Sequence, residues 1–217
     1  MFEQIIAYCE RTDFSYWSEP VNAVTNAAFV LAALYVWPKT RGLPLGRVLT
    51  ILLATIGVGS FLWHTHATGW AGLADMLPIL LFILLYVFAA TRDFLGASAV
   101  IAGGVTVAFF PYAFGFRALF GGVLPGANAL YASVVVLILI YGLWLRRSAT
   151  GRGLLIGAAV LSVSLGFRMA DGAVCPSFPI GSHFMWHILN GIMLGWMILV
   201  YCRHMRAAPL APRAPSG

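Results

Sequence analysis

Residues 72–91 read GLADMLPILLFILLYVFAAT, and this run of twenty residues carries a single charge, at Asp75. A helix that crosses the hydrocarbon core of a bilayer needs about 20 predominantly apolar residues. The run therefore predicts a membrane-spanning helix. Its one carboxylate requires an explanation, because an ionisable group within a membrane is costly and is a functional-site candidate by default.

The rest of the chain has the same character. Of its 217 residues, 61% are hydrophobic and only 9% are charged, whereas a soluble domain has about 25% charged residues. Six further apolar stretches have spanning length, namely 21–38, 47–65, 95–116, 122–145, 152–168 and 183–202. We therefore expect an all-α integral membrane protein with a seven-helix transmembrane bundle. The alternative is six spans, with residues 95–116 re-entrant.

We expect residues 1–206 to form one transmembrane domain and the Ala- and Pro-rich tail, 207–217, to be disordered. The N-terminus has Glu3 and no basic region followed by a cleavage site, so it is not typical of a signal peptide. The net charge is +6. The basic residues are spread over the loops and form no patch, which argues against a nucleic-acid partner.

The basic residues also predict an orientation. With the N-terminus outside, ten of them fall on the inner side: Lys39, Arg41, Arg47, Arg92, Arg146, Arg147, Arg152, Arg203, Arg206 and Arg213. Three fall on the outer side: Arg11, Arg117 and Arg168. The positive-inside rule therefore places the N-terminus outside and the C-terminus in the cytoplasm.

This orientation brings four ionisable residues to one depth, the outer boundary of the membrane. His64 ends an outward-going helix and Asp75 begins an inward-going one, while His183 and His187 begin the last. Residues more than a hundred positions apart in the sequence can therefore share a site.

Those residues suit a metal centre. His183 and His187 are spaced i, i+4 and share a helix face, so two imidazoles can chelate one ion, and His64 supplies a third nitrogen. Three protein ligands plus an open position are the pattern of catalytic zinc. Asp75 can transfer a proton, and Ser60, four residues before His64, can donate a hydrogen bond to an oxyanion. Together these groups predict the hydrolysis of an amide or ester.

Each residue also has a purely structural interpretation. The two histidines of the last helix can be a packed, hydrogen-bonded pair, and His64 an interfacial histidine. Asp75 can be an acid favoured by the helix dipole. Ser60 can be a small packing residue beside Gly57 and Gly59. The placement of these residues at one depth favours the metal interpretation.

Several motifs resemble the alkaline ceramidases. They are GVGSFLWH at 57–64, LADMLP at 73–78, GSHFMWH at 181–187, YCE at 8–10 and WSEPVNAVTN at 17–26. The resemblance runs from residue 8 to about residue 190. The combination of Ser-x3-His, Asp eleven residues later and His-x3-His is also similar to the wider superfamily, which includes the adiponectin receptors and membrane hydrolases that remodel lipid anchors.

The resemblance implies a seven-helix enzyme that hydrolyses the amide of ceramide to a sphingoid base and a fatty acid. It implies that His64, His183 and His187 bind zinc, that Asp75 acts on the attacking water, and that Ser60 stabilises the oxyanion. The apolar bundle is then expected to hold the acyl and sphingoid chains of a ceramide-like lipid.

The animal members of that family also carry a calcium site in the N-terminal segment. Glu10 and Glu19 match its acidic ligands, but Ala7 and Thr12 stand where the pattern has Asp and Asn. Asp13 is a candidate substitute ligand. Calcium takes 6–8 oxygen ligands, so the departures weaken this expectation. The alternative is that these acids cap and solvate a surface segment.

Two further expectations concern the outer loops. Asp171 is a candidate acceptor for a zinc-bound imidazole, or else it caps the loop or pairs with Arg168. The resemblance supports a disulfide between Cys9 and Cys175, which would tether the N-terminal segment to the loop before the last helix. Such a bond requires an oxidising compartment.

Other functions compete with the amidase. One is a lipid esterase or phospholipase of the same superfamily. Another is a receptor-like protein with structural zinc, which would tolerate the loss of Asp75. Arg outnumbers Lys twelve to one, which favours a bacterial source. We therefore expect the bacterial inner membrane, with the site near the periplasmic face. The sequence does not indicate an oligomeric state.

Overall fold

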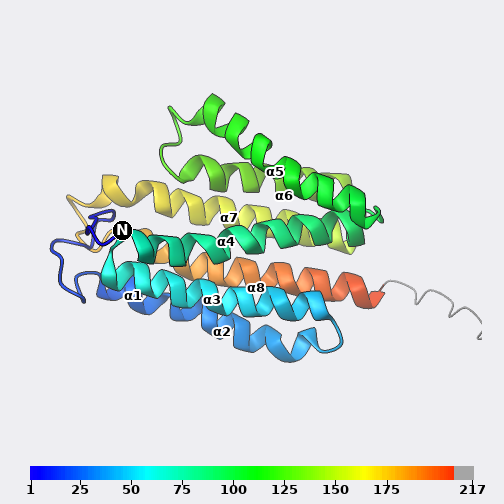
Figure 1. The fold of residues 1–217 in the computed structure, drawn as a ribbon, viewed down its shortest axis with the longest axis horizontal. Coiled ribbons are helices and arrows are strands. Elements are labelled where there is room, and N and C mark those ends of the chain that lie inside the picture. Colours follow the sequence, from blue (N-terminus) through cyan, green and yellow to red (C-terminus); the bar gives the residue numbers. More distant parts are fainter. Residues whose placement is uncertain (208–217) are drawn as a thin grey trace, which may run out of the picture.

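The chain is all-helical in a computed structural model, which describes residues 1–207, and this confirms the predicted class. The long helices lie side by side in a bundle (Figure 1). Within residues 1–207 the only strand-like pairing is an isolated bridge between Gln4 and Thr68. Ala207 is the last residue of the final helix, and the rest of the predicted tail lies outside the described residues.

The helices follow one another with short connections. The first apolar segment contains α1 (Pro20–Thr25), α2 (Ala27–Val36) and the 3₁₀ turn η1 (Trp37–Thr40). The others are α3 (Pro44–His66), α4 (Gly69–Ala89) with the π-helical turn η2 (Ala90–Phe94), α5 (Ala99–Phe120), α6 (Asn128–Trp144), α7 (Ala149–Val174) and α8 (His183–Ala207).

Six helical segments in the described chain are long and apolar enough to cross a membrane. The seventh predicted span, 122–145, is shorter: α6 begins only at Asn128 and has 17 residues. The sequence GGVLPG at 121–126 explains the loss, because Pro125 and the positive φ of 64° at Gly126 suit a turn rather than a helix. Residues 95–116, the segment considered as re-entrant, lie largely within the continuous 22-residue helix α5.

The first span is interrupted at Asn26, between α1 and α2. The Thr25 hydroxyl donates to the Val21 carbonyl at 2.8 Å, and the Asn26 amide donates to the Asn22 carbonyl at 2.8 Å. Side chains that bond to carbonyls of the preceding turn bend helices. The interruption lies at the level where Thr25 reaches His187 of α8.

Close approach of the helices depends on small residues. Gly59 of α3 lies against the backbone of Ala74 on α4, and Gly191 of α8 lies against the backbone of Ala28 on α2. A Cβ atom at either glycine would collide with that backbone. Small residues at such crossings are typical of helices that associate in membranes.

One end of the bundle carries the N-terminal segment, residues 1–19, together with the α3–α4 connection and the α7–α8 loop (Figure 1). The amide of Ile5 donates to the Ala67 carbonyl at 2.8 Å, and Cys9 and Cys175 are joined by a disulfide. We call this end, defined by residues 1–19, 67–68 and 175–182, the capped end. Helix α8 begins there and finishes at the opposite end.

Candidate metal centre

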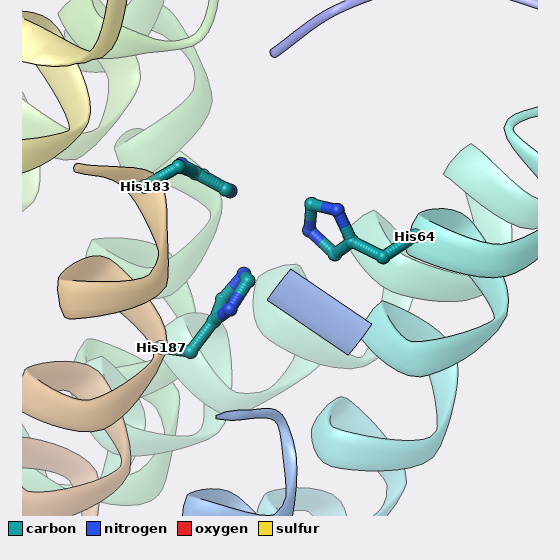
Figure 2. A group of neighbouring side chains, drawn as sticks. All are labelled: His64, His183 and His187. Atoms are coloured by element: carbon teal, nitrogen blue, oxygen red, sulfur yellow. The ribbon is translucent and has the colours of Figure 1, made fainter. Parts of the chain in front are cut away.

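Three histidines meet just below the capped end. His64 comes from α3, and His183 and His187 come from the first turns of α8 (Figure 2). Each ring offers one potential ligand nitrogen, and these three nitrogens all lie within 4.8 Å of one another. Each residue is only 1% exposed. The structure therefore brings together the three predicted ligands, and within residues 1–207 no other group of His, Cys, Asp or Glu qualifies as a metal site.

Asp171 fixes the start of α8, which presents two of these histidines. Its Oδ1 accepts the backbone N–H groups of Ser182 at 2.8 Å and His183 at 2.9 Å. Its Oδ2 accepts the Cys9 N–H at 2.9 Å. Asp171 therefore caps the helix from α7 and does not contact an imidazole. Ser182 does not cap with its side chain, since its hydroxyl donates to the Phe167 carbonyl at 2.6 Å.

His64 is oriented by a buried carboxylate. Glu19 Oε2 lies 2.6 Å from His64 Nδ1, and Glu19 Oε1 lies 2.6 Å from Nε of Arg11. Burial acts to raise the pKa of Glu19, but its bonds and charge interactions with His64 and Arg11 outweigh burial and hold the pKa below its ordinary value. Glu19 is therefore an anion that accepts Nδ1–H, so a neutral His64 ring carries its free lone pair on Nε2.

His187 is oriented by a hydroxyl. Thr25 Oγ1 lies 3.0 Å from His187 Nδ1, and its single proton is donated to the carbonyls of Val21 and Asn22. When this proton is donated to a carbonyl, the Thr25 oxygen accepts Nδ1–H from the ring. This assignment leaves Nε2 of His187 unprotonated.

Two imidazole nitrogens have no hydrogen-bond partner although they are buried. They are Nδ1 of His183 and Nε2 of His187. Unpaired buried polar atoms are costly. Three convergent imidazoles, two of them with their second nitrogen bonded to a carboxylate or hydroxyl, are the donor set and outer support of a zinc site with an open position. The residues present therefore fit a zinc ion.

Asp75 and Ser60 lie beside the triad. The Ser60 hydroxyl lies close enough to the Asp75 carboxylate to interact with it, and Asp75 is also an electrostatic neighbour of His64. This proximity follows from the close crossing at Gly59, because the absence of a side chain there lets α4 approach the turn of α3 that carries Ser60. The five residues predicted to carry the chemistry thus lie together.

Tyr8 closes the triad toward the capped end. Its ring stacks on His183 with 3.6 Å between centroids, and its centroid lies 5.2 Å from that of His64. Burial raises the pKa of the Tyr8 phenol, and the neighbouring Arg168 only partly offsets this effect. The Cys9–Cys175 disulfide lies next to Tyr8 in the chain and ties this part of the segment to the end of α7.

The three acids predicted as calcium ligands have separate partners. Glu10 accepts the backbone N–H groups of Val21 and Asn22, both at 2.8 Å, at the start of α1. Asp13 accepts the N–H and hydroxyl of Ser15. Glu19 serves His64 as described. Within residues 1–207 the three carboxylates do not gather as a metal group.

Arg11 supplies the cation in this region. Its guanidinium donates to the carbonyls of Asp13, Ser15 and His64 at 3.2, 3.3 and 2.8 Å, in addition to its bond with Glu19. Its side chain is fully buried. This role was not predicted from the sequence, in which Arg11 was interpreted only as a marker of topology. The sequence feature that could have indicated this role is a single arginine among the acids of a short polar segment.

Below the triad the bundle encloses an apolar cavity. It is lined at one end by Phe29, Ile56 and Trp186, and farther from the capped end by Ala90 and Tyr141. Residues of α4 and the start of η2 line it from Ile79 to Ala90, a rise of about 16 Å at 1.5 Å per residue. The cavity therefore extends from the level of the triad along the helices.

Comparison with known proteins does not assign the chain. No protein-family model matches it, and no curated protein does.

Proposed function

We propose that the protein is a zinc-dependent membrane amidase that hydrolyses the N-acyl bond of ceramide or a related N-acyl lipid, giving a sphingoid base or similar amine and a free fatty acid. The observation that carries the proposal is the pair of unpartnered nitrogens, on His183 and His187, in a buried triad beside a carboxylate. The sequence motifs that resemble the alkaline ceramidases support the choice of an amide.

In this proposal His64, His183 and His187 hold zinc. Zinc, when bound, lowers the pKa of water toward neutrality and polarises a carbonyl group. Glu19 and Thr25 keep two of the rings in the tautomers that bind a metal.

Asp75 is the proton-transfer group. It takes a proton from the attacking water and delivers it to the nitrogen of the departing amine, which would otherwise leave as a poor, anionic leaving group. Ser60 donates a hydrogen bond to the oxygen on which negative charge develops. The proximity of Ser60 to Asp75 supports a shared role for the two groups beside the triad.

The apolar cavity is the proposed acyl-chain site. Its lining is almost entirely apolar, and the end nearer the triad reaches Phe29 and Trp186. The Phe29 ring neighbours the His187 ring, and Trp186 precedes His187 in the sequence. A single chain bound there would present its amide carbonyl at the triad.

We also propose that α6 is a seventh span. Its 17 residues lie at the lower limit of about 17–25 for a crossing helix. Seven spans, the distribution of basic residues and the Cys9–Cys175 disulfide together favour an N-terminus and a catalytic centre at the periplasmic face of a bacterial inner membrane.

The test is a lipid panel. Purified protein, with zinc quantified by mass spectrometry, is incubated with an N-acyl sphingoid lipid, an N-acyl ethanolamine and a diacyl phospholipid, and fatty-acid release is measured. We expect release from the amides, loss of activity in His187→Ala, and retention in His66→Ala, a histidine on the same helix as His64 but outside the triad. Release from the phospholipid alone would favour the esterase alternative. Zinc binding without release from any lipid would contradict the amidase proposal.

A further inference from the structure

A second cation lies near the triad. Arg168 of α7 donates from Nη1 to the Tyr8 hydroxyl at 2.7 Å and from Nε to Asn128 Oδ1 at 3.1 Å. Its guanidinium carbon lies 5.3 Å from the Trp186 ring and 5.4 Å from the rings of Tyr8 and Tyr131. Since Tyr8 stacks directly on His183, one aromatic ring separates this guanidinium from the metal centre.

Arg168 has no carboxylate partner among residues 1–207. The ion pairs there are Arg11–Glu19, His64–Glu19 and Arg92–Asp93. Asp171, one turn along α7, uses its oxygens for three backbone N–H groups. Asp75 acts on Arg168 only at longer range.

Arg168 and Arg11 differ in how many of their N–H donors have protein acceptors. Arg11 directs its donors to four oxygens and is completely enclosed. Arg168 has five N–H groups but, within the described part of the chain, only two protein acceptors, both of them neutral. A partly buried guanidinium with unused donors recognises carboxylates and phosphates well, because it can donate two parallel, charge-assisted hydrogen bonds.

Arg168 is also accessible. It lines an open, mainly polar cavity of about 500 Å³ at the capped end, together with Tyr8, Asn128 and Asp171. An anionic group can therefore reach Arg168 from outside the bundle.

We propose that Arg168 binds an oxyanion, a carboxylate or phosphate, carried by the lipid on which the triad acts. The proposal rests on the proposed amidase function and refines its substrate class: an N-acyl lipid with an anionic amine portion is preferred to a neutral one. The same chemistry is offered by the carboxylate of the released fatty acid, so the experiment separates the two sources.

The first arm compares kcat/KM for an N-acylglycine and the matched N-acyl ethanolamine, which share the amide and acyl chain and differ in charge. In the wild type the anionic lipid is favoured. Arg168→Gln lowers the anionic-to-neutral ratio by about tenfold or more, as expected for loss of a charged hydrogen-bonded pair. Arg168→Lys retains part of the preference. Arg203→Gln, which removes another arginine packed on a tryptophan, leaves the ratio unchanged.

The second arm measures equilibrium binding of laurate and of dodecanol to the same variants in neutral detergent. Weaker laurate binding in Arg168→Gln, with the hydrolysis ratio unchanged, identifies the product carboxylate as the ligand. If Arg168→Gln remains folded by its melting temperature and changes neither the ratio nor laurate binding, the anion site is refuted. This arm requires no turnover, so a wild type that cleaves no lipid refutes the amidase while leaving the anion site testable.

Discussion

The Glu19 carboxylate lies 2.6 Å from His64 Nδ1 and thereby determines which nitrogen of that ring is free to bind a metal. The same carboxylate is bound by Arg11 and by the Asn22 amide. A connected set of side chains thus joins the N-terminal segment, the first span and α3 at the metal centre.

Replacing Glu19 with Gln should weaken zinc binding by roughly 10–100-fold, the usual cost of losing an outer partner of a metal-bound histidine. A neutral amide no longer stabilises the Nδ1–H tautomer as an anion does. Competition with a chromogenic chelator gives the affinity. Glu3→Gln, at an exposed position of the same segment, is the control. Equal zinc affinities for Glu19→Gln and the wild type would show that the carboxylate does not support the ligand.

Thr25→Val should reduce zinc affinity about tenfold, because valine fills the same space but cannot accept Nδ1–H from His187. Thr25→Ser keeps the hydroxyl and should restore most of the affinity. The same chelator competition measures both variants. If the serine variant is as weak as the valine variant, the effect comes from packing and not from the hydrogen bond.

Gly59→Ala should abolish hydrolysis, since a Cβ there meets the Ala74 carbonyl and must push α4, with Asp75, away from Ser60. Gly166→Ala on α7 is the matched control, because a Cβ at that glycine meets no atom within 4 Å. Fatty-acid release and zinc content are measured for both. Full activity in Gly59→Ala would contradict the proposed role of the close crossing.

Calcium should not stabilise the protein, because each candidate carboxylate already has a partner: Arg11 binds Glu19, Ser15 binds Asp13, and two backbone N–H groups of α1 bind Glu10. A ligand that binds only the folded state raises its melting temperature in proportion to the logarithm of its concentration above the dissociation constant. We therefore expect equal melting temperatures in millimolar calcium and in a calcium-selective chelator. A calcium-dependent rise would support the site that the sequence resemblance implies.

Cys9→Ala should lower the free energy of unfolding by about 2–4 kcal/mol, the typical contribution of a disulfide. The bond links residues 166 positions apart and holds the segment that carries Tyr8 and Arg11. Cys202→Ala is the control, because Cys202 is buried but unbridged. Denaturant unfolding in a mild detergent gives both values. Equal losses in the two variants would mean that the bridge contributes nothing beyond packing.

Much of the architecture could be predicted from the sequence because hydropathy alone identifies long apolar helices. The spacing of His183 and His187 and the alternating helix direction were enough to gather the triad with Asp75. The start of α6 was misplaced, because an apolar turn such as residues 121–126 has the hydropathy of a span.

The supporting residues could not be predicted in the same way. Whether Glu19 binds an ion or an imidazole depends on where residues 11 and 64 meet it in space. The cap of α8 comes from Asp171 across the α7–α8 loop and not from the adjacent Ser182, a choice that only the tertiary structure reveals. Local patterns do not encode such partners.

The most direct test of the central claim is fatty-acid release by zinc-loaded Asp75→Asn protein, beside the wild type, with zinc content measured in the same samples. Asparagine keeps the shape of the side chain but cannot take up the proton. The proposal predicts about one zinc per chain in both proteins and hydrolysis of the N-acyl lipid only by the wild type. Undiminished hydrolysis by Asp75→Asn would contradict it, as would a zinc-loaded wild type that releases no fatty acid.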